Sequence, residues 1–156
     1  IRHYLKSKDL ETGALYRPNS NPYYEPHFLA GIKQGGAPIV PKGSAGTIQM
    51  VRHIRNGGFF AILADQYVLM SKNIAFLGHE TQTTTSPAEL ALKYGVPLVP
   101  AFGLRDENAT NIHITFQEPI PHSDPITMMT EFNARMGVQI NANPGQWYWL
   151  HRRWKH

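Results

Sequence analysis

The sequence contains no cysteine, which excludes disulfide bonds and thiolate ligands for a metal ion. It also has no apolar run approaching the roughly 20 residues that span a bilayer as a helix, and no signal-peptide pattern. None of its eight histidines has the spacing of a zinc-binding His-Glu-x-x-His motif, so we expect no metal and no cofactor. A Gly-x-Ser-x-Gly elbow, a P-loop and a Gly-x-Gly-x-x-Gly fingerprint are also missing, which removes the usual signals of serine hydrolases and nucleotide-binding enzymes.

The composition is that of a folded protein. Its 156 residues are 42% hydrophobic and 17% charged, which predicts a single domain over residues 1–156 with its own core. The formal net charge of +4 is modest and suits an acidic partner or an anionic surface. The sequence begins with Ile1 rather than Met, and we expect it to be part of a longer protein.

An apolar stretch in the middle of the chain ends at an acid. Residues 59–64 are all apolar, two glycines precede them, and Asp65 follows. A short continuous apolar run of this kind predicts a strand buried on both faces of a parallel sheet. Ligands of such sheets bind beyond the carboxyl ends of the strands, which makes Asp65 a candidate site residue.

Strand-like and helix-like segments alternate along the chain. This order predicts an α/β fold with a mostly parallel central sheet flanked by helices. Asn21, Ser44 and Ser86 are expected to cap three of the helices, and Gly95 to end the third. We expect helices over residues 22–33, 44–56, 86–94 and 126–140, and extended segments over residues 13–16, 38–41, 59–64, 73–77, 81–85, 97–104 and 111–117.

Three charged residues follow predicted strands: Arg17, Lys42 and Asp65. If the strands are parallel, all three lie along one edge of the sheet, where the two cations could hold a phosphate. The alternative is that each residue simply ends a strand in solvent.

His113 and Glu118 have the spacing of a catalytic base and its orienting acid in many acyltransferases. On a strand, however, an offset of five residues puts the two side chains on opposite faces and about 16 Å apart. A base must lie within hydrogen-bond reach of its partner, so we do not expect this pair to be catalytic.

The end of the chain, residues 146–155, combines aromatic and basic side chains. Such a mixture is typical of a membrane interface, and it can also stack on and neutralise single-stranded nucleic acid. A third alternative is a terminal helix that docks its tryptophans into the core. The residues concerned are Trp147, Trp149, Arg152, Arg153 and Trp154.

Six sequence blocks carry a family resemblance. They are Tyr16-Arg17-Pro18 with Asn21-Pro22, Ile39-Val40-Pro41-Lys42, Ala64-Asp65-Gln66, Phe76-Leu77-Gly78, residues 86–100 and residues 144–155. In these blocks and their order the chain resembles the carboxyl-terminal two-thirds of the bacterial lipid A biosynthesis (lauroyl/myristoyl) acyltransferases, within the lysophospholipid acyltransferase-like superfamily. The last block, Pro-x-Gln-Trp-x-Trp-x-His-Arg-Arg-Trp-Lys, is the most specific. Ala64 departs from the family, which has proline there.

The resemblance implies a glycerol-phosphate-acyltransferase-like fold whose amino-terminal part is missing. It implies acyl transfer from an acyl carrier protein to a hydroxyl of a lipid A precursor. Arg17, Asn21, Lys42 and Gln66 would then bind substrate, and Asp65 would support the site. The family's His-x₄-acid catalytic pair precedes the first block, so we expect no catalytic residue in this chain and no activity of the chain alone.

The resemblance also implies a location at the cytoplasmic face of the bacterial inner membrane, with the membrane anchor outside this chain. Trp147, Trp149 and residues 152–154 would meet the anionic membrane surface, and nucleic acid would not be a partner. Two alternatives remain. One is a non-catalytic domain that binds anionic lipid or nucleic acid, and the other is an unrelated α/β enzyme that uses Asp65.

Overall fold

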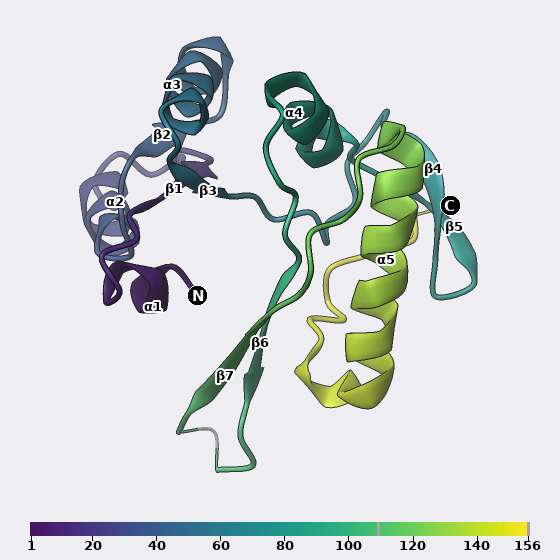
Figure 1. The fold of residues 1–156 in the computed structure, drawn as a ribbon. Coiled ribbons are helices and arrows are strands. Elements are labelled where there is room, and N and C mark those ends of the chain that lie inside the picture. Colours follow the sequence, from purple (N-terminus) through teal and green to yellow (C-terminus); the bar gives the residue numbers. More distant parts are fainter. Residues whose placement is uncertain (109, 156) are drawn as a thin grey trace. The chain divides into compact units, whose positions relative to one another are not determined.

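Three short parallel strands organise the first part of the chain in the computed structural model, which describes residues 1–108 and 110–155 (Figure 1). The chain divides into two compact units, Ile1–Ile62 and Leu63–His156. The single domain expected over residues 1–156 stays a prediction.

The first unit consists of two successive βαβ crossovers. The strands pair in the order β2-β1-β3, and every pair is parallel. Parallel neighbours need a crossover connection, and here a helix supplies each one. The elements are α1 (Arg2–Lys6), β1 (Thr12–Tyr16), α2 (Glu25–Lys33), β2 (Ile39–Pro41), α3 (Ser44–Arg55) and β3 (Phe59–Ala61).

Helix α3 packs closely against this sheet. Its buried residues are Gly46, Met50 and Ile54, and Val40 of β2 is fully buried beneath it. A Cβ atom on Gly46 would collide with the Pro41 carbonyl oxygen, so only glycine allows this approach. The close contact fixes the end of β2, where Lys42 follows.

The apolar stretch after Gly58 forms a shorter and more exposed strand than the sequence predicts. Strand β3 covers only Phe59–Ala61, and Phe59 is 51% exposed. Leu63, which we expected inside the sheet, is 79% exposed and belongs to the second unit. The prediction of burial on both faces is therefore wrong. Among the described residues β3 is only three residues long and pairs with β1 alone, and α3 is the helix that packs against it.

The three predicted N-terminal helix caps are all placed differently. Helix α2 begins at Glu25, and the Asn21 side chain instead accepts a hydrogen bond from the Tyr23 amide within the preceding turn. Ser44 is the first residue of α3, after Gly43 with φ of 138°. In the third helix Thr85 holds the N-cap position, and Gly95 ends the helix in the left-handed conformation as predicted.

The second unit contains two antiparallel hairpins and a long helix. Its elements are β4 (Lys72–Phe76), β5 (His79–Thr83), α4 (Ser86–Tyr94), β6 (Ala101–Arg105), β7 (Ile112–Phe116), α5 (Pro125–Ala142) and the 3₁₀ turn η1 (Pro144–Gln146). Helix α5 lies against β4 and α4 (Figure 1). No helix in the described part of the chain is long and apolar enough to cross a bilayer.

The two hairpins of the second unit are antiparallel, so the expected parallel pairing does not extend to them. Leu77 and Gly78 both have positive φ, which forms the two-residue turn typical of a tight hairpin between β4 and β5. Residues 106–111 join β6 to β7, and so short a loop allows only antiparallel pairing. The α/β class is confirmed, but the parallel part is the three-stranded sheet of the first unit.

Two apolar clusters form the core of the second unit. The first joins α4, α5 and β4. The second surrounds Phe76 and Met136 and includes Trp147 and Trp154 from the end of the chain. Trp147 and Trp154 of the carboxyl-terminal segment therefore pack against the core, and the described residues 147–155 form no helix.

Candidate functional site

Arg17 and Lys42 follow the carboxyl ends of two neighbouring parallel strands. Tyr16 and Pro41 are register partners in β1 and β2, and the two cations are the next residues of their strands. The Lys42 amide donates a hydrogen bond of 2.8 Å to the Tyr16 carbonyl, which extends the pairing to the cations. Both side chains are exposed. The structure thus brings together two of the three predicted edge residues, at a point open to a ligand.

Glu25 orders the loop that follows Arg17, a role that the sequence analysis missed. One carboxylate oxygen accepts a hydrogen bond of 2.9 Å from the Tyr16 hydroxyl, and the other accepts one of 2.7 Å from the Asn19 amide. The hydrogen bond to Glu25 is the main reason that the pKa of Tyr16 is raised, followed by desolvation. Asn21, a predicted substrate contact, is exposed in this loop.

This corner can hold an anion. A guanidinium offers a planar fork that matches two oxygens of a phosphate, and an ammonium adds a point charge. The position at the carboxyl ends of parallel strands is also where α/β sheets bind ligands.

Asp65 and Gln66 lie in the second unit, so their predicted place beside Arg17 and Lys42 stays a prediction. Gln66 is exposed and Asp65 is partly buried. The Oδ1 atom of Asp65 is buried and has no hydrogen-bond partner among the described residues. The residue before it, Ala64, belongs to the core, which anchors this end of the loop.

Arg153 is a buried residue, with 1% of its surface exposed. Its guanidinium donates hydrogen bonds to the Thr81 hydroxyl (3.0 Å), the Gln82 carbonyl (2.7 Å) and the Thr83 hydroxyl (2.6 Å). It also lies 5.3 Å from the centroid of the Phe76 ring. Arg153 is thus an interior link between the end of the chain and β5, and it does not face a membrane.

The two outer tryptophans of the terminal block also pack inward. The ring centroids of Trp154 and Phe76 are 5.3 Å apart, and the planes of these two rings are nearly parallel. The ring centroids of Trp147 and Phe76 are 6.0 Å apart. Trp149 and Arg152, in contrast, are exposed, and Trp149 is 54% exposed. Of the five residues predicted at the membrane interface, Trp147, Arg153 and Trp154 therefore pack inward, whereas Trp149 and Arg152 are exposed.

Burial changes the proton affinity of Arg153. Desolvation lowers the pKa of its guanidinium, and the negative charge of Asp65 opposes this effect. One sequence signal could have revealed the buried arginine. Thr81 and Thr83 are two residues apart on a strand, so their side chains lie on the same face. Two hydroxyls on a buried face need hydrogen-bond partners.

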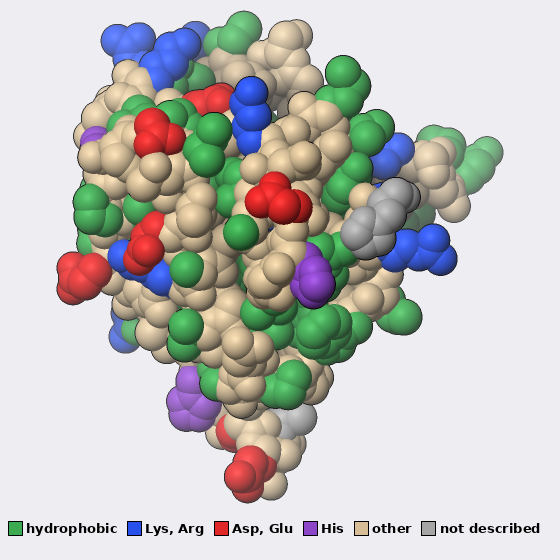
Figure 2. All heavy atoms as spheres, turned by 90° about the vertical axis from the view of Figure 1, so that its right-hand side faces the viewer, with side chains coloured by type: hydrophobic (Ala, Val, Ile, Leu, Met, Phe, Trp, Pro, Cys, Tyr) green, Lys and Arg blue, Asp and Glu red, His purple; other side chains and the backbone are tan. Residues whose placement is uncertain are grey.

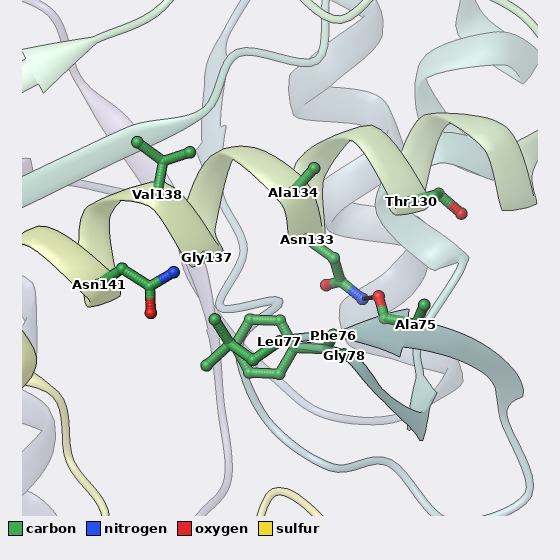
Figure 3. A pocket seen from close by; sticks show the side chains of 10 residues that line it. All are labelled: Ala75, Phe76, Leu77, Gly78, Thr130, Asn133, Ala134, Gly137, Val138 and Asn141. Atoms are coloured by element: carbon green, nitrogen blue, oxygen red, sulfur yellow. Dashed lines mark hydrogen bonds between the residues drawn. The ribbon is translucent and has the colours of Figure 1, made fainter.

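A groove of about 310 Å³ runs between α5 and the end of β4 (Figure 3). Phe76 and Leu77 face the helix across it, and the Asn133 side chain donates a hydrogen bond of 3.0 Å to the Ala75 carbonyl. None of the predicted site residues lines this groove.

The histidines belong to no metal-binding group in the part of the chain that the structure describes. No group of three or more His, Asp or Glu side chains could hold a metal ion there. His113 and Glu118 are both exposed, and no hydrogen bond joins them among these residues. The Glu118 carbonyl instead accepts a hydrogen bond from Arg135.

The fold defines an α/β protein with two exposed cations at neighbouring strand ends. The family model described as bacterial lipid A biosynthesis acyltransferase matches residues 2–156. Because the match covers nearly the whole sequence, the chain belongs to this family. The family suggests lipid A acyltransferase activity, with a lipid A precursor as substrate. A comparison with curated proteins finds no match.

Proposed function

We propose that the intact protein transfers an acyl chain from an acyl carrier protein to a hydroxyl of a lipid A precursor. This chain supplies the substrate-binding part. The observation that carries the proposal is the family match over residues 2–156. The geometry of Arg17 and Lys42 supports it, because a lipid A precursor is a phosphorylated glycolipid and the two cations suit a phosphate.

In the proposed reaction the hydroxyl oxygen of the acceptor attacks the thioester carbonyl carbon. The new C–O bond forms, the C–S bond breaks, and the hydroxyl proton ends on the thiol of the released carrier. Arg17 and Lys42 hold the acceptor phosphate, Asn21 and Gln66 add polar contacts, and Asp65 supports the reacting centre. The net charge of +4 favours docking of an acidic carrier protein.

The membrane surface is the proposed location of the acceptor, at the cytoplasmic face of the bacterial inner membrane. Tyr148, Trp149 and Leu150 are 68%, 54% and 82% exposed, and the exposed Arg152 follows closely. Aromatic and aliphatic side chains beside a cation suit the headgroup region of an anionic bilayer. Apolar side chains are also plainly exposed on the face drawn in Figure 2.

Sedimentation with anionic vesicles tests this location. We expect the double variant Trp149→Ala with Leu150→Ala to lose most vesicle binding. Ile112→Ala is the matched control, since Ile112 is 57% exposed on the β6–β7 hairpin of the same unit. Equal binding by all three proteins contradicts the location. Binding to an oligonucleotide that weakens steeply with salt supports a nucleic-acid-binding domain instead.

Acyl transfer by the intact protein, compared for phosphorylated and dephosphorylated acceptors, tests the function and the phosphate site together. We expect Arg17→Ala to lower kcat/KM about 10- to 100-fold with the phosphorylated acceptor, the loss expected for one hydrogen bond to a charged group. With the dephosphorylated acceptor the variant and the wild type should differ little. Arg55→Ala, which removes an exposed arginine from α3, should leave both rates unchanged.

Two results contradict this proposal in different ways. If no acyl chain reaches the phosphorylated acceptor, the proposed activity is wrong. If Arg17→Ala loses as much activity with the dephosphorylated acceptor, the activity stands but the phosphate role of Arg17 does not.

A further inference from the structure

The last residues of the chain contact the loop that carries Asp65 and Gln66. We call residues 151–155 the terminal arm. The Tyr67 amide, next to Gln66 in the chain, donates a hydrogen bond of 2.9 Å to Nε2 of His151. The Lys155 ammonium lies 4.8 Å from the centroid of the Tyr67 ring. Two contacts, one to the backbone and one to a side chain, therefore hold the same residue of the loop.

The terminal arm is itself fixed to β5. Besides the three bonds that its guanidinium donates, Arg153 accepts a hydrogen bond of 2.5 Å at its backbone carbonyl from the Thr81 hydroxyl. Thr83, in turn, lies within reach of Asn133 of α5 (3.4 Å). The arm is thus linked to a strand and a long helix, which gives the loop a rigid support.

Among the described residues, no direct ion pair balances the buried charge of Arg153. Within residues 1–108 and 110–155 the salt bridges join Lys6 to Glu11 and Arg135 to Glu131, and neither includes Arg153. A buried cation without an ion pair is costly to desolvate, and the hydrogen bonds that Arg153 donates to β5 offset this cost. Asp65 is the acid whose charge acts on Arg153. The buried cation and the candidate site residue are therefore electrostatically coupled.

We propose that the terminal arm positions Asp65 and Gln66 for the reaction, with His151 as the positioning residue and Arg153 as the anchor of the arm. This inference rests on the proposed function, because that function gives Asp65 and Gln66 their roles. A small displacement at a reacting centre reduces the rate strongly, and a bond to the adjacent amide limits such displacement. The arm acts through the loop and does not touch the substrate.

Substitutions of His151 in the intact protein test the inference. His151→Leu removes the acceptor for the Tyr67 amide, whereas His151→Gln places a carbonyl oxygen close to the position of Nε2 and keeps an acceptor. The readouts are kcat and KM for acyl transfer and the hydrogen-exchange rate of the Tyr67 amide. The matched control is His122→Leu, which removes a histidine hydrogen bond of 3.1 Å to the Val96 carbonyl elsewhere in the same unit.

We expect His151→Leu to lower kcat about tenfold, as for one lost hydrogen bond, with little change in KM. Its Tyr67 amide should exchange faster, while the tryptophan fluorescence stays that of the folded protein. His151→Gln should restore both kcat and amide protection, and His122→Leu should change neither. A purely structural histidine would not give this combination of a kcat effect and rescue by glutamine.

Three outcomes overturn the inference, and they are distinguishable. If wild type and His151→Leu exchange the Tyr67 amide equally fast, the arm does not hold the loop. If exchange accelerates but kcat is unchanged, the arm holds the loop without positioning the site, and the proposed function stands. If the wild-type protein transfers no acyl chain, the proposed function fails and the positioning role falls with it.

Discussion

Replacement of Arg153 by methionine tests how the end of the chain stabilises the second unit. Methionine is close to arginine in length but has no donor for the hydroxyls and the carbonyl of β5 that Arg153 binds. The substitution also removes a cation that is 1% exposed. The two effects oppose each other, so the result measures which one is larger.

The expected size of the change follows from these two effects. Each hydrogen bond from a charged donor contributes about 1.5–3 kcal/mol, which gives roughly 4–9 kcal/mol for the three bonds. Removing the buried cation recovers several kcal/mol of desolvation energy. Thr81 and Thr83 also keep other hydrogen bonds, to the Arg153 carbonyl and the Thr81 carbonyl. We therefore expect a net loss of about 2–4 kcal/mol.

Urea unfolding followed by tryptophan fluorescence measures this loss. All three tryptophans lie in the unit Leu63–His156, so their signal reports that unit alone. A loss of about 2–4 kcal/mol should lower the urea midpoint by roughly 1–2 M for a unit of this size. Arg153→Lys keeps the charge but not the fork, and we expect it to be at least as destabilising as Arg153→Met.

The matched control is Arg135→Met on α5. Arg135 forms an ion pair with Glu131 and a hydrogen bond to the Glu118 carbonyl, but near the surface. Its replacement should cost less than about 1 kcal/mol. An unchanged or raised midpoint for Arg153→Met would show that the hydrogen bonds do not outweigh the cost of the buried charge.

Two further predictions concern the supports of each unit. Gly46→Ala should destabilise the first unit by about 1–3 kcal/mol, because its Cβ collides with the Pro41 carbonyl. Gly31→Ala in α2, which meets no atom, should be neutral or stabilise by up to about 1 kcal/mol; thermal unfolding by circular dichroism separates the two. The pKa of the helix-capping Asp124 is lowered mainly by a hydrogen bond from the Thr127 side chain and next by one from the Thr127 backbone. Stability from this group is thus present above the unfolded pKa of about 4 and lost as pH falls through the lower folded value. Asp124→Asn should keep the cap but remove this acid dependence in unfolding curves from pH 2 to 6, and identical pH profiles would contradict it.

The neighbouring positions of Arg17 and Lys42 could be predicted from the sequence, because these positions depend on the order of strands and helices along the chain. Each βαβ crossover makes its strands parallel, so residues that directly follow paired strands share an edge, as Arg17 and Lys42 do. The helix ending at Gly95 was equally local, since a left-handed glycine stops a helix whatever surrounds it.

Other features depend on contacts between distant residues and could not be read from local patterns. Asn21-Pro22 has the form of a helix start, but Pro26 offers a second proline that suits the first turn, and the helix uses that one. For the basic, aromatic end of the chain, the local pattern leaves a membrane interface, nucleic acid binding and core docking as alternatives. Only the packing of β5 beneath it shows that Arg153 completes the hydrogen bonding of two buried threonines.

Acyl transfer is measured from the mass of the acceptor after incubation of the intact protein with an isotopically labelled acyl carrier protein thioester and a lipid A precursor. We expect the acceptor to gain the mass of one labelled acyl chain, and one free carrier thiol to appear for each product formed. An acceptor of unchanged mass, with the thioester intact or merely hydrolysed to free fatty acid, would contradict the proposed acyl transfer.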